Sequence, residues 1–360
     1  MTRSTLTREK PGRRFEFDVD DASRATLTRI SEEFRLRSFY APGESLRMVM
    51  AAGFTISSLS EQEAGFSHDL LNDLNRRTHS LTCHRNALYT RAGTIAEGDI
   101  DGEEALEAEL AEVSSTLRYA RGDFARHHAL MAEAYRAVLS AVRGEELSPV
   151  HGFTVDISDP VSSRLGPVWV SHADVYPASW YEKAERFPLT LRETEGRSYY
   201  HARKQGETGR VNELALPAGE FTAGKNTLLL HELAHYFESV IPDIAIHEAM
   251  FLSDRIRRNP ARASLRYLVG DGGQDDEFGY ADLFRYGYTG RAYRDMENAG
   301  LTDLTVLDTG RGLEILSTGV EGLFAGSHHV FYGRESGPVF NMDTGLRDFV
   351  LGLLALIARR

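Results

Sequence analysis

The sequence predicts an α+β protein in which a helical domain precedes a domain with a small sheet and several helices. Two observations predict this order. From residue 22 to about residue 143, apolar residues recur three or four positions apart, as they do in amphipathic helices. After Pro149, short β-type runs are punctuated by Gly, Pro and Asp, and helical patterns return from Ala223 onward. The predicted segments are a disordered leader (1–15), a helical domain (16–148) and an α+β domain (149–360).

The helical domain is expected to contain a long helical hairpin. Its two helices are predicted within residues 61–91 and 103–142, and a Gly-rich, acidic stretch (93–102) separates them. A short connection between two long helices is typical of antiparallel neighbours. The simpler interpretation is a scaffold with a solvated, charged face. The alternative is an arm that binds a substrate or a protein partner.

The second domain is expected to begin with strands and to end with helices. The β-type runs cover residues 153–157, 168–171, 189–192, 198–202 and 213–216. Runs of this length, bounded by turn-forming residues, are typical of short strands. The strands therefore precede the helical region in which the chemistry described below is concentrated.

Composition excludes several classes of function. The chain carries 41 Lys and Arg against 53 Asp and Glu, and its formal net charge of -12 argues against a general nucleic-acid-binding protein. The single cysteine, Cys83, cannot form an intrachain disulfide. The polar N-terminus lacks the apolar core of a secretory signal. The longest apolar run (349–358) is shorter than the roughly 20 residues of a membrane span. We expect a cytoplasmic protein without a membrane partner.

The segment His231-Glu232-Leu233-Ala234-His235 is the strongest chemical signal in the chain. Histidines four residues apart lie one helical turn apart on one face, so that both imidazoles can reach a single metal ion. Neutral imidazole suits Zn²⁺ at about 2.0–2.1 Å. Glu232, next to the first histidine, can then take a proton from a water molecule at the metal. The apolar neighbours of this motif predict a helix that is buried on its other side.

A catalytic zinc site needs a third protein ligand. The class of metalloproteases with a histidine six residues beyond the motif is excluded, because that position is Ile241. Glu314 is the predicted third ligand, since it begins an apolar-striped segment in which Ser317 and Gly319 are small enough to let that helix approach the motif helix. His247, Glu248 and Asp254 remain alternatives. Glu321 is expected to be an outer or solvated carboxylate.

The C-terminal third of the chain, from about residue 222 to residue 357, resembles the zincin-like metallopeptidases of the His-Glu-x-x-His plus glutamate (gluzincin) type. More narrowly, it resembles zincin domains of phage and prophage proteins. The stretches that carry the resemblance are residues 231–238, 286–293, 314–321 and 346–352. The resemblance implies a Zn²⁺ cofactor, Glu314 as a metal ligand, and a peptide or protein substrate. The first 145 residues match no family in this way.

The oxyanion of peptide hydrolysis needs a hydrogen-bond donor besides the metal. Tyr293 is the predicted donor, because it lies in the segment before Glu314; Tyr288, His328 and His329 are alternatives. Cys83 is interpreted as a buried structural cysteine. The sequence thus predicts a zinc metallopeptidase. The competing hypothesis is a zinc-containing structural or binding module of a phage-related or toxin-type assembly, without hydrolytic activity, in which the N-terminal helices hold a partner.

Overall fold

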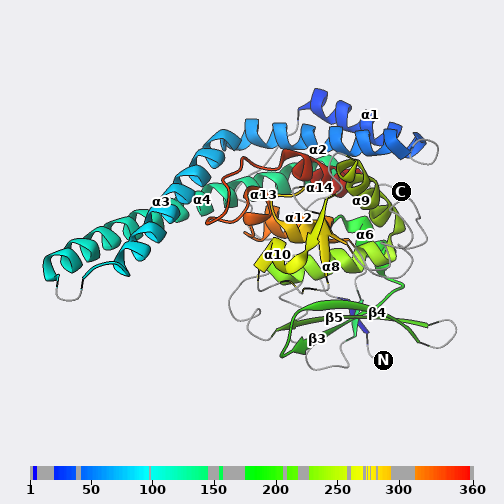
Figure 1. Cartoon of the computed structure of the whole chain (residues 1–360). Coiled ribbons are helices and arrows are strands. Elements are labelled where there is room, and N and C mark those ends of the chain that lie inside the picture. Colours follow the sequence, from blue (N-terminus) through cyan, green and yellow to red (C-terminus); the bar gives the residue numbers. More distant parts are fainter. Residues whose placement is uncertain are drawn as a thin grey trace.

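The fold combines helices with two small sheets, which confirms the predicted α+β class. The computed structural model describes residues 3–5, 20–37, 42–96, 99–144, 154–156, 175–205, 209–217, 227–257, 261–270, 273, 275, 277–280, 283–292 and 313–356. One sheet has five strands in the order β1-β2-β3-β5-β4, and the other has three in the order β6-β7-β8. Helices fill most of the space on one side of the larger sheet (Figure 1).

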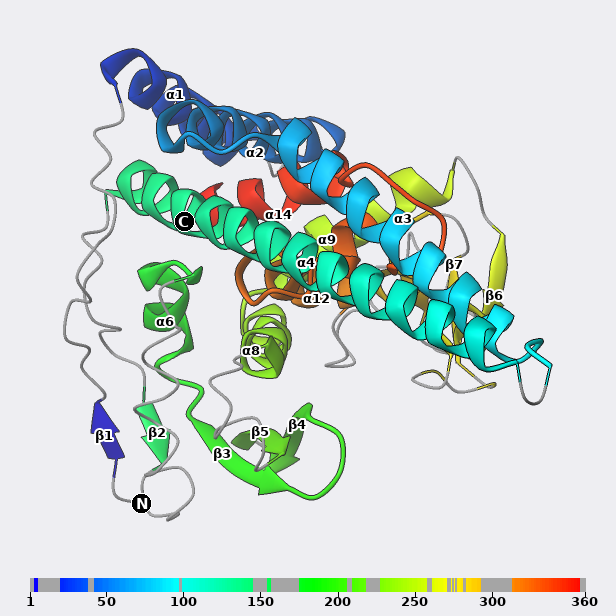
Figure 2. The same cartoon turned by 90° about the vertical axis from the view of Figure 1, so that its left-hand side faces the viewer.

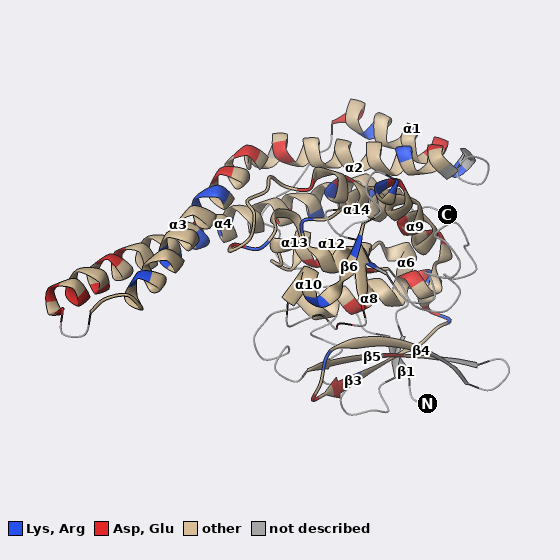
Figure 3. Ribbon diagram, in the orientation of Figure 1, with Lys and Arg blue, Asp and Glu red and all other residues tan. Residues whose placement is uncertain are grey.

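Four helices form the N-terminal part: α1 (Asp21–Arg37), α2 (Pro42–Ala64), α3 (His68–Ala92) and α4 (Ile100–Arg143). Helices α3 and α4 pack along each other as the predicted hairpin, and its outer half projects from the rest of the molecule (Figures 1 and 2). We call this outer half of the hairpin the arm (residues 80–96 and 99–118). The acidic residues at the start of α4 lie close together near the tip of the arm (Figure 3).

Local signals set the ends of these helices. Gly65 adopts φ +67°, a conformation that glycine tolerates best, and it ends α2. The first hairpin helix therefore begins at His68, after the cap Ser67, and not at residue 61. Asp99 caps α4 by accepting a hydrogen bond from the Gly102 amide, and Gly144 ends α4 with φ +67°.

The N-terminal helices share one hydrophobic core with the C-terminal helices. Helix α14 (Thr344–Leu356) crosses α2, and two glycines let the backbones touch. A Cβ at Gly53 would lie 1.7 Å from the Asp348 carbonyl oxygen, and a Cβ at Gly352 would lie 1.9 Å from that of Val49. The core cluster accordingly runs without interruption from α1 to α14.

The larger sheet lies beneath the motif helix. Its strands are β1 (Arg3–Thr5), β2 (Thr154–Asp156), β3 (Leu189–Thr194), β4 (Tyr199–Gln205) and β5 (Gly209–Pro217). Strand β3 runs parallel to β5, with Leu189 opposite Asn212, and β4 pairs antiparallel with β5 as an edge strand. Four of the five predicted runs coincide with β2 to β5, and residues 168–171 lie outside the described residues. Within the predicted disordered leader, β1 pairs with β2, whereas residues 6–15 are also not described.

The remaining elements surround the motif helix, α8 (Thr227–Val240), which contacts β4, β5 and the short helix α6 (Ala178–Ala184). Helix α9 (Pro242–Ile256) follows it directly. The small sheet consists of β6 (Arg262–Ser264), β7 (Phe278–Tyr280) and β8 (Arg291–Ala292), with α10 (Leu265–Val269) and the 3₁₀ helix η3 (Gly287–Gly290) beside it. Helix α12 (Glu314–Phe324) lies between α8 and α14, and the short helix α13 (His329–Tyr332) packs against α12 and α14.

Candidate metal centre

The motif helix α8 places both histidines at one point. Its apolar side, which includes Leu229, Leu233 and Phe237, is buried in the core. The opposite side carries His231 and His235, whose ring centroids lie 5.0 Å apart. The spacing of four residues therefore brings the two imidazoles together, as predicted from helix geometry.

Glu314, the first residue of α12, reaches the same point. Its Oε2 lies 3.3 Å from His231 Nε2 and 3.3 Å from His235 Nε2. Within the described part of the chain, these three residues are the only group of His, Cys, Asp or Glu side chains whose ligand atoms could hold a metal ion, and those atoms lie within 4.8 Å of one another. Two imidazoles and one carboxylate form the ligand set of several catalytic zinc sites.

The rival ligands lie elsewhere. The Asp254 carboxylate is 39% exposed and pairs with Arg257. His247 is buried between Ser45 Oγ, at 2.5 Å, and the Asp243 carbonyl, to which its Nδ1 donates at 2.6 Å. Glu248 accepts a hydrogen bond from the Leu316 amide at 2.7 Å. None of the three belongs to the group formed by His231, His235 and Glu314.

The two small residues of α12 do not both act as predicted. The role expected for Gly319 is wrong, and Ser317 has an additional role. Gly319 faces α14, because a Cβ there would lie 2.4 Å from Val350 Cγ2; it does not bring α12 close to α8. Ser317 donates a hydrogen bond to Glu314 Oε2 at 3.2 Å. A serine one turn after the glutamate thus fixes the carboxylate on the same face of α12.

Each histidine is held by an outer carboxylate. His231 Nδ1 lies 3.0 Å from Glu321 Oε2, and His235 Nδ1 lies 3.1 Å from Glu238 Oε2. An Nδ1–H that donates to a carboxylate leaves Nε2 as the metal-binding nitrogen and fixes the plane of the ring. Both Nε2 atoms face Glu314. Once a metal ion displaces the proton on Nε2, each ring would keep its Nδ1 proton and be the tautomer that metal binding requires.

The electrostatics of the site are dominated by carboxylates. Burial lowers the pKa of the His231 imidazole, but hydrogen bonds to Glu314 and Glu321 outweigh this effect and raise that pKa to about 10. The pKa of His235 is raised for the same kind of reason, chiefly by Glu238 and Glu314. Burial alone would raise the pKa of Glu314, yet the two histidines hold it well below its usual value. This concentration of buried negative charge suits a divalent cation.

A second layer of contacts orients Glu314 from the other side. Arg291, in β8, donates to Glu314 Oε1 at 3.3 Å and to the Tyr288 hydroxyl at 2.9 Å, and it pairs with Glu277. Arg291 thus holds Glu314 Oε1, while Glu314 Oε2 faces the two histidines. Sequence reasoning did not identify Arg291 as a functional residue, because an arginine between two tyrosines carries no spacing signal.

The predicted oxyanion donor, Tyr293, lies outside the described residues. Of the alternatives, the Tyr288 ring lies 6.5 Å from the His231 ring. His328 packs against Phe124 with ring centroids 4.7 Å apart, and His329 packs against Tyr286 at 4.6 Å. Of these three alternatives, Tyr288 therefore lies beside the candidate metal ligands.

Glu232 lies on α8 directly after the first histidine and is only 5% exposed. Over the described ranges, no side chain or backbone amide donates a hydrogen bond to it. Cys83, by contrast, is exposed, so the interpretation as a buried cysteine is wrong. Its Sγ lies 3.5 Å from His79 Nε2, one turn away on α3 and apart from the metal ligands.

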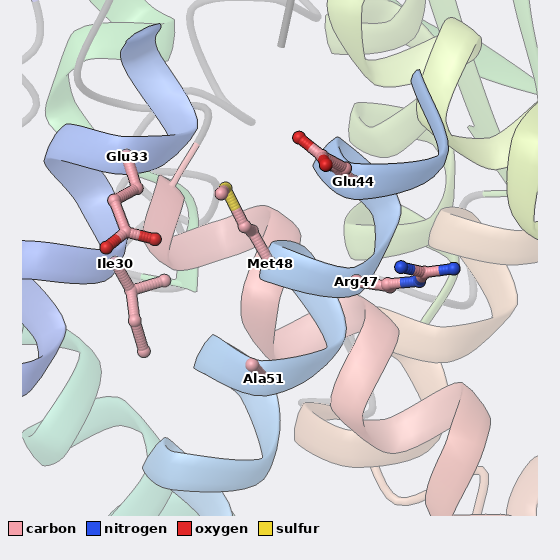
Figure 4. A pocket seen from close by; sticks show the side chains of 6 residues that line it. All are labelled: Ile30, Glu33, Glu44, Arg47, Met48 and Ala51. Atoms are coloured by element: carbon pink, nitrogen blue, oxygen red, sulfur yellow. The ribbon is translucent and has the colours of Figure 1, made fainter. Parts of the chain in front are cut away.

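A hollow of about 300 Å³ lies between α1 and α2 (Figure 4). Ile30, Met48 and Ala51 form its apolar part, and Glu33, Glu44 and Arg47 surround them. No metal ligand lines this hollow, so it is separate from the metal centre.

Comparisons of the chain with protein-family models, with curated proteins and with solved structures found no match. None of the helices in the described ranges combines the length and apolar character needed to cross a membrane.

Proposed function

We propose that this protein is a zinc-dependent hydrolase whose substrates are peptides or proteins. One observation carries the proposal: His231, His235 and Glu314 converge, with Glu232 beside them on the same helix. A set of two histidines and one carboxylate leaves a coordination position open for water or substrate. A site that only stabilised the fold would need a closed ligand set and would have no use for Glu232.

The protein groups divide the chemistry between them. When bound, Zn²⁺ would polarise the scissile carbonyl and make a water molecule more acidic. Glu232 takes the proton of the attacking water and passes it to the nitrogen of the leaving amine, so that it ends the cycle ionised as it began. Glu321 and Glu238 keep the two imidazoles in their metal-binding orientation. Tyr288 and the predicted donor Tyr293 are the candidates for binding the developing oxyanion.

The substitution Glu232→Gln tests this assignment. The amide fills the same space but cannot accept the proton, so hydrolysis of a labelled unfolded protein should fall by about 10²- to 10⁴-fold. Zinc content, measured by elemental analysis, should stay near one per chain. A variant as active as the parent would show that another group is the base.

The competing function is a zinc-containing binding module, in which the arm holds a protein partner. The projection of the arm from the body of the molecule favours this alternative (Figure 1). It predicts that zinc-loaded parent protein cleaves nothing in a broad peptide library. Glu232→Gln would then change neither metal content nor partner binding.

A further inference from the structure

Two carboxyl groups lie buried behind the metal ligands. Glu238, near the end of α8, is 3% exposed, and Glu248, in the middle of α9, is fully buried. The two groups interact with each other, and burial raises the pKa of both, with the neighbouring Glu238 adding to the rise for Glu248. A buried carboxyl group is costly unless its oxygens have partners, so each of these groups calls for a physical explanation.

Each group is anchored by one oxygen to a different part of the metal centre. Glu238 Oε2 lies 3.1 Å from His235 Nδ1. Glu248 Oε1 accepts a hydrogen bond from the Leu316 amide at 2.7 Å. The other oxygens, Glu238 Oε1 and Glu248 Oε2, are buried and accept no hydrogen bond from any donor among the described residues.

The hydrogen bond from the Leu316 amide to Glu248 matters because Leu316 lies in the first turn of α12. The first amides of a helix have no partner inside the helix, and here the N-cap residue, Leu313, has no side chain that could accept from them. Glu248 fills that role from α9. Glu314, the third ligand, stands two residues before Leu316 in the same helical turn. The contact therefore fixes the end of the helix that presents Glu314.

We propose that Glu248 is a positioning residue that sets the distance between His235 and Glu314. Glu248 accepts from the Leu316 amide, in the same helical turn as Glu314. It also interacts electrostatically with Glu238, whose carboxylate holds His235. This inference rests on the proposed metal site, but it does not depend on the reaction catalysed. Glu248 thus acts one side chain behind the metal and is not itself a ligand.

Three substitutions at Glu248 test this role. Gln can accept from the Leu316 amide and donate to Glu238, so Glu248→Gln should keep zinc affinity within about threefold of the parent. Leu can do neither, and Asp is too short to reach both partners. Loss of an outer partner of a metal ligand costs about 10- to 100-fold in metal affinity, which is the fall expected for Glu248→Leu and Glu248→Asp.

Two readouts separate positioning from general stability. Zinc affinity is measured by competition with a chelator, and the geometry of the site is read from the visible absorption of the Co²⁺-substituted protein. Leu252→Ala is the matched control, because Leu252 is fully buried in the same helix. It should lower the melting temperature without changing the cobalt spectrum, whereas Glu248→Leu should change the spectrum. If Glu248→Leu does not fold, Glu248→Asp serves in its place.

The proposal is overturned if the Leu and Asp variants bind zinc and cobalt as the parent does. It is also overturned if Glu248→Gln loses as much zinc affinity as the Leu and Asp variants. The same holds if Leu252→Ala changes the cobalt spectrum as much as Glu248→Leu does. A parent protein that binds cobalt but hydrolyses nothing would refute the proposed function alone, because the positioning of the ligands would still be visible in the spectrum. A parent that binds neither metal would overturn both.

Discussion

The metal centre and the arm hold their charged residues in opposite ways. At the metal centre, Glu314, Glu238 and Glu248 are buried, and each interacts with a named partner. On the arm, the pair between Arg91 and Glu109 is 51% and 37% exposed. The acidic residues near the tip, Asp101, Glu103 and Glu104, are exposed. Burying a charge is costly, whereas solvating one is nearly free. The buried set is therefore the part of the molecule whose charges need a functional explanation.

The largest expected effect lies in the metal ligands. Glu314→Ala should lower zinc affinity by more than the roughly 100-fold that loss of an outer partner costs, because it removes a ligand. Asp254→Ala should leave zinc affinity nearly intact, since Asp254 pairs with Arg257 at the surface. Competition with a chelator measures both affinities. The opposite ranking would identify Asp254 as the ligand.

Two leucine-to-alanine substitutions compare the packing of the two regions without changing any charged residue. Leu233→Ala, in α8, should lower the free energy of unfolding by about 2–5 kcal/mol, because the surrounding core cannot collapse onto the cavity. Leu106→Ala should cost less, near the lower end of that range at about 2 kcal/mol, since Leu106 belongs to a small separate cluster with Leu88 and Val113. Urea titrations of both variants provide the measurement. Equal losses would mean that the arm is packed as tightly as the core.

Zinc binding should release protons. The raised pKa values of His231 and His235 mean that both imidazoles hold a proton at neutral pH before the metal displaces it. For each proton displaced, the free energy of zinc binding becomes more favourable by about 1.4 kcal/mol per pH unit. We expect about two protons to be displaced. Titration calorimetry in buffers of different ionisation enthalpy counts them. Glu321→Gln should release fewer, because it removes one cause of the raised pKa at His231. A heat independent of the buffer would contradict this.

The junction between the two regions should be sensitive to acid. His128, in α4, is buried, and burial together with His328 lowers its pKa to about 3. A histidine whose folded pKa is depressed stabilises the fold above its unfolded pKa and loses that contribution as pH falls from about 6.5 towards 3. Between pH 7 and 5 the loss should be on the order of 2 kcal/mol.

The variant His128→Asn should flatten this acid dependence, because it keeps a side-chain donor near the Gly322 carbonyl but cannot titrate in this range. His84→Asn is the control, since that side chain is 50% exposed on the arm. Unfolding curves at pH 5 and pH 7 compare the two. An unchanged slope for His128→Asn would mean that the acid sensitivity originates elsewhere.

Local geometry explains which parts of this structure the sequence could predict. The relation between His231 and His235 depends on one helical turn, so spacing alone places them together. Glu314 was predictable because it begins an apolar-striped helix. The contacts of Arg291 and Glu248 depend on how distant elements pack, and no spacing in the chain encodes them. For the same reason Gly319 could be recognised as a close-packing residue while the helix that it contacts, α14, could not.

The glycines where α2 and α14 cross have a consequence for how the chain can be divided. Gly53 of α2 lies against the backbone of α14, and Gly352 of α14 lies against the backbone of α2. A side chain at either position would clash with the opposing helix. A truncated protein beginning at residue 149 would retain the metal ligands but expose the apolar face of α14 to water. We would expect it to aggregate when expressed alone. The metal-binding half and α2 should therefore fold only together, whereas the arm packs around its own small cluster of Leu88, Leu106 and Val113.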